Sequence, residues 1–183
     1  APLVLLLPKT SPYKTVVALI AAAKASPKKI NFGNAGVGST SHLIAALFES
    51  KAGIDVTPVS YKGAAPAMND LVGGQVDAMF DQSNTALPQV VGGRLNAIAL
   101  TSLTPMPQQY PNVPALAEKT LPGFEAATWY GLYAPKGVPK EVVQKLHLAY
   151  LKALGDKEWT KRMASQGINL LPEAQYAPDA FAK

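Results

Sequence analysis

The sequence predicts an α/β fold in which a mostly parallel sheet carries helices on both faces. Short runs rich in Val, Ile and Phe alternate with longer segments of helical period, and glycine or proline stands at the joints. Such alternation is typical of repeated strand–helix units. The chain has 183 residues, 48% of them apolar, which is enough to bury one good core or a core and part of a second.

The alternation places each element in order along the chain. Strands are expected near Leu3–Leu7, Ile30–Gly33, Val56–Tyr61, Ala78–Asp81, Ala97–Thr101 and Thr128–Tyr133. Helices are expected near Tyr13–Ala25, Ser41–Ala52, Pro66–Gly73, Thr85–Val91, Val113–Lys119, Pro139–Leu154 and Lys157–Gln166. This order implies parallel strands that are joined by right-handed crossovers.

The last part of the chain has a different composition. Pro139 suits the first turn of a helix, Gly155 suits its end, and Asp156 can cap the helix that follows. After these helices the sequence has one short apolar run and no further set of strands. We therefore expect Pro139–Lys183 to belong to a second domain, most of which lies outside this sequence.

Composition excludes several classes of site. The chain has no cysteine, which excludes thiolate metal sites and disulfides, and its two histidines have no close acidic partners, which argues against a metal centre. The net charge is +5, but the basic residues are scattered and are not interleaved with aromatics. That pattern argues against nucleic acid as a partner and favours small acids.

No apolar run approaches the ~18 residues that span a membrane, so direct membrane insertion is not expected. The opening block "APLVLLL" ends at Pro8 and lacks the basic region and the cleavage site of a signal peptide. If the protein is exported, we expect its signal peptide to have been removed already.

The stretch "GNAGVGSTSH", Gly33 to His42, lies between an expected strand and an expected helix. The first amides of a helix have no internal partner and lie at the positive end of its dipole, and a glycine-rich entry lets an anion come close. Gly36 and Gly38 provide that freedom, while Ser39 and Thr40 add hydroxyl donors. This corner suits a carboxylate. The alternative is that these hydroxyls only cap the helix.

Three other motifs fail at the same stretch. The glycine spacing resembles a phosphate-binding loop, but the lysine is missing, and Ser41 replaces the third glycine or alanine of a dinucleotide fingerprint. No G-x-S-x-G nucleophile elbow occurs. His42 would need an orienting acid and an oxyanion site to serve a hydrolase, and packing beside the sheet is the simpler interpretation.

Further candidate residues follow other strands. Tyr61, Lys62 and Gly63 come after the third expected strand, where ligands gather in open parallel sheets; Lys62 could equally be a solvated surface charge. Asp81 could meet an amine on the ligand or a bridging water; the alternative is that it caps the helix near Thr85 or forms a hydrogen bond within the protein.

Two more candidates stand later in the chain. Thr101 ends the fifth expected strand at the same edge of the sheet. Trp129 could line a cleft or be buried between domains.

Four motifs follow one another along nearly the whole chain: "GxGSxxHL", "YKGxAPAxxDLxxGxVD", "MFD" and "PxVPxLAE…LPGFE". In this respect the sequence resembles the solute-binding receptors of tripartite tricarboxylate transporters, also called Bordetella uptake gene receptors. The resemblance implies a periplasmic-binding-protein-like fold of two α/β lobes that close on a small carboxylate: a di- or tricarboxylate, an aromatic acid or an amino acid. It implies membrane transporter subunits as partners, a periplasmic location, no catalytic residues and no cofactor.

The resemblance also implies which parts are present. The usual first-lobe strand and its proline- and glycine-rich loop do not precede "APLVLLLPK". Residues 1–126 would form the complete second lobe, and residues 127–183 the crossing strand and the C-terminal helices of an incomplete first lobe. The backbone of Gly36, Val37 and Gly38 with the hydroxyls of Ser39 and Thr40 would form the second-lobe half of the ligand clamp.

Two alternatives stay open at this point. One is a nucleotide- or coenzyme-binding α/β enzyme that uses the Gly33–Ser39 loop. The other is a structural module in which the polar corner is only a helix cap.

Overall fold

The computed structural model describes residues 1–168, 170, 176 and 177. The chain divides into two compact units, Ala1–Thr128 and Trp129–Lys183, and each is described here by itself.

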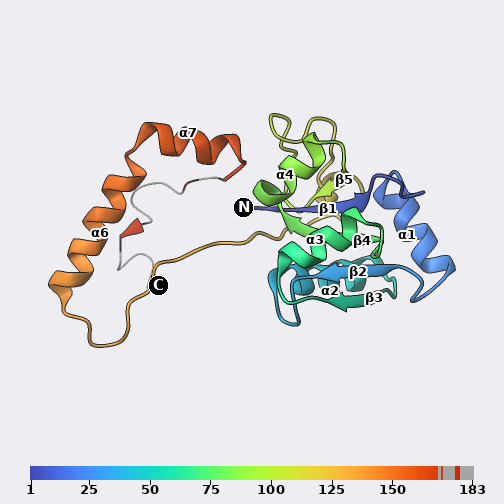
Figure 1. Cartoon of the computed structure of the whole chain (residues 1–183), viewed down its shortest axis with the longest axis horizontal. Helices are drawn as coiled ribbons and strands as arrows, with labels where there is room; N and C mark the ends of the chain where they lie inside the picture. The colour runs from blue at the N-terminus through green and yellow to red at the C-terminus, as the bar shows by residue number, and fades with distance from the viewer. Residues whose placement is uncertain (169, 171–175, 178–183) are drawn as a thin grey trace. The chain divides into compact units, whose positions relative to one another are not determined.

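The first unit holds a five-stranded sheet (Figure 1). Its strands are β1 (Leu3–Pro8), β2 (Asn31–Asn34), β3 (Thr57–Ser60), β4 (Ala78–Gln82) and β5 (Leu95–Leu100), in the order β3-β2-β4-β1-β5. β2 is parallel to β3 and β4, whereas β1 is antiparallel to both β4 and β5. β5 therefore points the same way as β4, and β1 alone in this sheet is reversed. The predicted α/β fold is confirmed with a mixed sheet: the pairings of β2 are parallel as expected, whereas both pairings of β1 are antiparallel.

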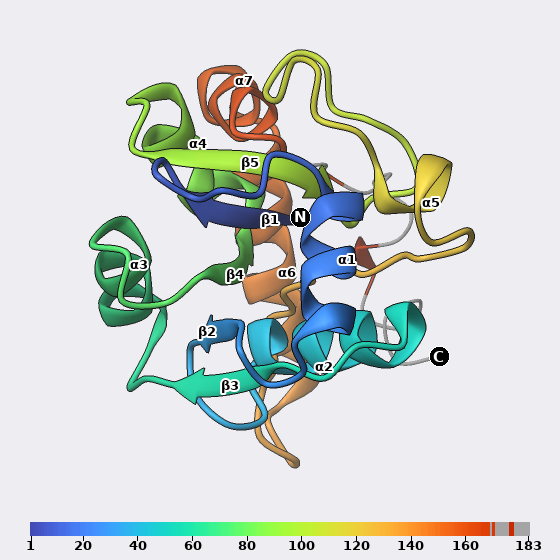
Figure 2. The ribbon, with the colours of Figure 1, turned by 90° about the vertical axis from the view of Figure 1, so that its right-hand side faces the viewer.

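Helices cover both faces of this sheet. They are α1 (Val16–Ala25), α2 (Thr40–Ala52), α3 (Ala64–Val72), α4 (Ser83–Val91) and the short α5 (Leu116–Lys119). Side chains of α1 and α2 belong to one buried cluster and those of α3 and α4 to another, and Figure 2 shows α1 and α2 on one side of the sheet and α3 on the other.

β1 is apolar throughout because both of its faces are covered. Leu3, Leu5 and Leu7 belong to the cluster under α1 and α2, and Val4 and Leu6 belong to the opposite one. A strand that is buried on both faces has no need of polar alternation. The run "LVLLLP" is therefore a central strand.

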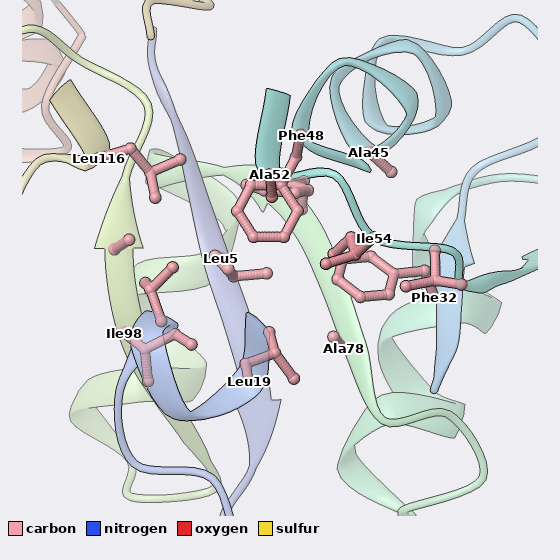
Figure 3. Close-up of a cluster of buried hydrophobic side chains, with 14 of the residues drawn as sticks. Leu5, Leu19, Phe32, Ala45, Phe48, Ala52, Ile54, Ala78, Ile98 and Leu116 are labelled. Carbon is pink, nitrogen blue, oxygen red and sulfur yellow. The ribbon is translucent and has the colours of Figure 1, made fainter. Parts of the chain in front are cut away.

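α2 is fixed on the sheet by aromatic packing. Its Phe48 is fully buried, and its ring centroid lies 6.2 Å from that of Phe32 and 5.5 Å from that of Phe80. Figure 3 shows Phe48 and Phe32 beside Leu5 and Ala78 in this cluster. This packing sets the place at which α2 begins, and hence the position of the loop before it.

The expected helix over Val113–Lys119 is wrong in its first half. The Leu100 amide donates to the Pro114 carbonyl, 2.9 Å away, and Ala115 forms a bridge with Leu100. This pairing holds the backbone of Ala115 extended, with φ −76° and ψ 141°. The helix can therefore begin only at Leu116.

The second unit contains α6 (Lys140–Leu154) and α7 (Lys157–Ser165). As expected, Gly155 follows the end of α6, and the Asp156 side chain caps α7 by accepting from the Trp159 amide at 2.9 Å. Neither helix has a buried residue.

The expected strand over Thr128–Tyr133 is wrong. Ala127 bridges Pro2, and Thr128 exchanges backbone hydrogen bonds with Ala1, but the described residues form no ladder from Trp129 to Tyr133. Aromatic residues favour a strand only where a neighbouring strand accepts them, because the preference reflects packing on a sheet.

Candidate functional site

One edge of the sheet gathers most of the predicted site residues. β2, β3, β4 and β5 all end at this edge and β1 begins there, since Leu3 lies opposite Gln82 and Val4 opposite Leu100. α2, α3 and α4 each begin there, directly after β2, β3 and β4. Three helix N-termini therefore lie along one edge and make it attractive to anions.

Hydroxyl groups organise the start of α2. Ser39 is the N-cap, and its Oγ accepts from the His42 amide at 3.3 Å and lies 3.1 Å from Ser41 Oγ. Ser41 is buried, and its Oγ accepts from the Ala35 amide at 2.9 Å. The interpretation of Ser39 as a helix cap is thus confirmed, while contact between its hydroxyl and a ligand stays a prediction.

The two glycines of the corner have backbone conformations that other residues rarely adopt. Gly36 has φ +123° and Gly38 has φ +80°. The Gly36 amide donates to Asn34 Oδ1 at 3.0 Å, and the Gly38 amide donates to Nδ1 of His42 at 3.3 Å. Both glycine amides that were expected to face a ligand are therefore bonded within the corner.

The donors that remain lie between and after these glycines. In the described part of the chain, the amides of Val37, Thr40 and Ser41 donate to no protein acceptor. Val37 is 83% exposed, and Thr40 is half-buried. Of the three amides predicted to meet a ligand, only Val37 is still available. Thr40 and Ser41 take the place of Gly36 and Gly38 as donors.

The loop after β3 packs directly against this corner. The Gly63 amide donates to the Ala35 carbonyl at 3.1 Å, and a Cβ on Gly36 would lie 3.2 Å from the Tyr61 carbonyl oxygen. The predicted groups Gly36–Thr40 and Tyr61–Gly63 are thus brought together, and Lys62 lies exposed on the second of these loops.

The Tyr61 hydroxyl has a protein partner. It donates to Asp70 Oδ2 in α3 at 2.8 Å. Burial raises the pKa of Tyr61, and the hydrogen bond to Asp70 and the charge of that carboxylate raise it further. This hydroxyl stays protonated at neutral pH and ties the loop to α3.

Asp81 lies at the end of β4 and is only 5% exposed. Its Oδ2 accepts from the Thr85 hydroxyl at 2.6 Å. Burial raises the pKa of Asp81, against the opposing effect of hydrogen bonds from Thr85 and the Gln82 backbone. The expectation that Asp81 bonds within the protein is confirmed, but the expected helix cap is wrong, because Gln82 is the N-cap of α4 and no side chain among the described residues caps that helix. Contact between Asp81 and a ligand stays a prediction.

Thr101 is fully buried and its hydroxyl is used by the backbone. Thr101 Oγ1 accepts from the Leu3 amide at 2.7 Å and donates to the Ala126 carbonyl at 2.6 Å. The proposed ligand contact has no support in this geometry, because the hydroxyl holds the start of β1 and the segment after α5 together.

Sequence reasoning missed polar atoms at the start of α4. Ser83 is fully buried, and within the described residues neither its Oγ nor Oδ1 of Asn84 has a hydrogen-bond partner. The signal was present in the sequence, since the polar stretch "DQSN" comes directly after the apolar run "AMF".

Hydrolase chemistry at His42 finds no support. Its Nδ1 accepts from the Gly38 amide, and Ser39 Oγ contacts the His42 backbone. No serine hydroxyl in the described chain is bonded to the imidazole ring, so a Ser–His pair is not assembled.

Trp129 belongs to the second unit, where it is 69% exposed.

Among the residues that the structure describes, none of the helices has both the length and the apolar character needed to cross a membrane.

Comparisons with known proteins agree with this fold. The chain matches the family described as "Tripartite tricarboxylate transporter family receptor" over residues 1–180. A curated relative from Pseudomonas sp. (strain P51), the UPF0065 protein in the tcbD-tcbE intergenic region, is 37% identical over 182 residues, which are 99% of this chain and 53% of the relative. The chain thus spans about half the length of that relative.

Two solved structures are similar over nearly the whole chain. The periplasmic binding protein BugD has a TM-score of 0.91 and 36% identity, over 98% of this chain and 60% of its own. MatC from Rhodopseudomonas palustris, solved with bound malate, has a TM-score of 0.92 and 33% identity, over 99% of this chain and 61% of its own. The family match and these likenesses together show that the chain belongs to the receptor family of the tripartite tricarboxylate transporters.

Proposed function

We propose that this chain supplies the ligand-holding corner of a periplasmic receptor that captures a small organic carboxylate for the membrane subunits of a tripartite transporter. The observation that carries the proposal is that the amides of Val37, before α2, and of Thr40 and Ser41, at its start, donate to no acceptor among the described residues. No side chain from Gly33 to Ser41 can carry a charge, so the corner attracts an anion through N–H groups and the helix dipole.

Two or three of these amides match the two oxygens of a carboxylate. Each hydrogen bond to a charged group contributes about 1.5–3 kcal/mol. Because the donors belong to a backbone that is already folded, little order is lost when the ligand binds. The malate bound to MatC, a family member with 33% identity, supports a small carboxylate as the ligand class.

We further propose that Ala1–Thr128 is one complete lobe and that the second unit is the connecting segment and the C-terminal helices of the other. No residue of α6 is buried, and Leu146 and Leu148 are 47% and 56% exposed. A helix of this composition gains most of its stability from packing its apolar side on another element. The greater length of the relatives supports the idea that a further part of the lobe covers it.

The proposed role is binding and not catalysis. The His42 ring is occupied by a backbone amide, and the similar protein BugD is a periplasmic binding protein. A nucleotide-binding enzyme is the alternative that the same corner allows.

A substitution at Thr40 tests the proposal, because this residue is the first of α2. Proline fits that helix position, and Ser39 before it has φ −66° and ψ 159°, which a following proline accepts. Thr40→Pro therefore removes the amide donor and the hydroxyl, while Thr40→Ala removes the hydroxyl alone. The pair isolates one N–H group.

The measurement is an amide NMR titration of the 183-residue chain with malate, succinate and ATP. We expect weak binding, since the chain is about half as long as its relative, and NMR detects weak binding. Malate should shift the Val37 and Ser41 signals, and Thr40→Pro should weaken this response about tenfold relative to Thr40→Ala. Equal responses of the two variants, or a response to ATP and not to the acids, would overturn the proposal.

A further inference from the structure

His42 is the residue that reaches back from α2 to the glycine loop. Its Nδ1 accepts from the Gly38 amide at 3.3 Å, four residues earlier in the chain. Gly38 has φ +80°, and a Cβ at this position would have no atom within 4 Å. The Cβ side of Gly38 is therefore open, and among the described residues the Gly38 amide donates to His42.

The hydrogen bond determines the tautomer of the neutral imidazole ring of His42. A nitrogen that accepts a hydrogen bond from an amide has no proton of its own, so the ring proton of neutral His42 lies on Nε2. A carbonyl or amide oxygen at the same place could replace Nδ1, whereas an apolar side chain could not.

We propose that His42 is a positioning residue for the ligand site: by holding the Gly38 amide it fixes the loop that carries the Val37 amide and leads to the Thr40 amide, the two donors that a ligand would use. The turn closes with a second bond, from the Ser39 amide to the Gly36 carbonyl at 3.1 Å. Glycines with few contacts regain much conformational freedom when a tie is lost. A ligand would then have to order the loop at the moment it binds, which lowers affinity. The role in binding rests on the proposed function; the hold on Gly38 does not.

A matched pair of variants separates the acceptor from the size of the side chain. In His42→Asn, Oδ1 stands where Nδ1 stood and accepts the same bond. His42→Leu has a similar volume and a higher helix propensity but offers no acceptor. A weaker helix therefore cannot explain a loss that appears only in His42→Leu.

The first measurement is independent of any ligand. In the wild-type chain, ¹⁵N NMR of the neutral imidazole should find Nδ1 unprotonated and Nε2 protonated. Hydrogen exchange of the Gly38 amide should be about three- to tenfold faster in His42→Leu than in the wild type, and close to wild type in His42→Asn. A neutral ring with its proton on Nδ1, or equal exchange in all three proteins, would overturn the proposal.

The second measurement is the titration with malate. His42→Leu should bind about three- to tenfold more weakly, with His42→Asn restoring most of the affinity. If both variants bind malate as the wild type does, the positioning role is refuted and the carboxylate site stands. If no protein of the set responds to malate, the proposed function fails, and the exchange measurement alone decides whether His42 holds Gly38.

Discussion

Thr101→Val should destabilise the first unit strongly, although the two side chains have almost the same shape. The substitution leaves two groups without their partner: the Leu3 amide, now 2.7 Å from Oγ1, and the Ala126 carbonyl, now 2.6 Å from it. Thr101 is fully buried, so water does not readily replace the hydroxyl. An unsatisfied buried group costs about 1–3 kcal/mol, and two of them give an expected loss of about 2–6 kcal/mol.

The assay is urea unfolding followed by far-ultraviolet circular dichroism, with Thr101→Ser as the control. Serine keeps the hydroxyl and loses one methyl group, so it should cost about 1 kcal/mol. The distinction matters because Thr101 was expected to touch the ligand. If Thr101→Val costs less than about 1 kcal/mol, the hydroxyl is not the structural link described here.

Two further predictions concern the sheet edge. Gly36→Ala should cost more stability than Gly38→Ala, because both positions have positive φ but a Cβ on Gly36 would also lie 3.2 Å from the Tyr61 carbonyl oxygen; equal losses in urea unfolding would contradict this. The free energy of unfolding of Asp81→Asn should increase relative to that of the wild type as pH rises from about 4 to 7. The pKa of Asp81 is raised above 3.8 in the folded state, so its contribution to stability is present below that value and lost as pH rises through the folded pKa. Thermal unfolding at several pH values would refute this if the difference between the two proteins stayed constant.

The elements of the first unit could be predicted because their signals are local. The apolar run of β1 and the periodic apolar positions of α2 reflect burial that each segment carries in its own residues. The glycine corner was recognised for the same reason, since strand, loop and helix follow one another without interruption.

The roles of single polar residues could not be predicted, because their partners are distant in sequence. Thr101 bonds with Leu3, 98 residues away, and no local pattern indicates that pairing. The choice of free amides in the corner depends on Asn34 and His42, whose side chains take up the Gly36 and Gly38 donors. Composition shows that such groups are present but not which of them are already paired.

The strand expected from Thr128 failed for a related reason. Its aromatic residues have high strand propensity, but a strand also needs a neighbour. Pairing with the start of β1 ends at Thr128, so propensity alone gave the wrong answer.

The reversed interior strand β1 affects how the protein is made. β1 leaves the ribosome before every other strand of this sheet, yet its two neighbours are β4 and β5, which emerge much later. Until then "LVLLL" is an unpaired apolar segment that can associate with other nascent chains. A charged residue would protect it during synthesis, but burial on both faces in the finished sheet leaves no position for one. Slow translation between α1 and β5 should therefore increase aggregation of newly made protein.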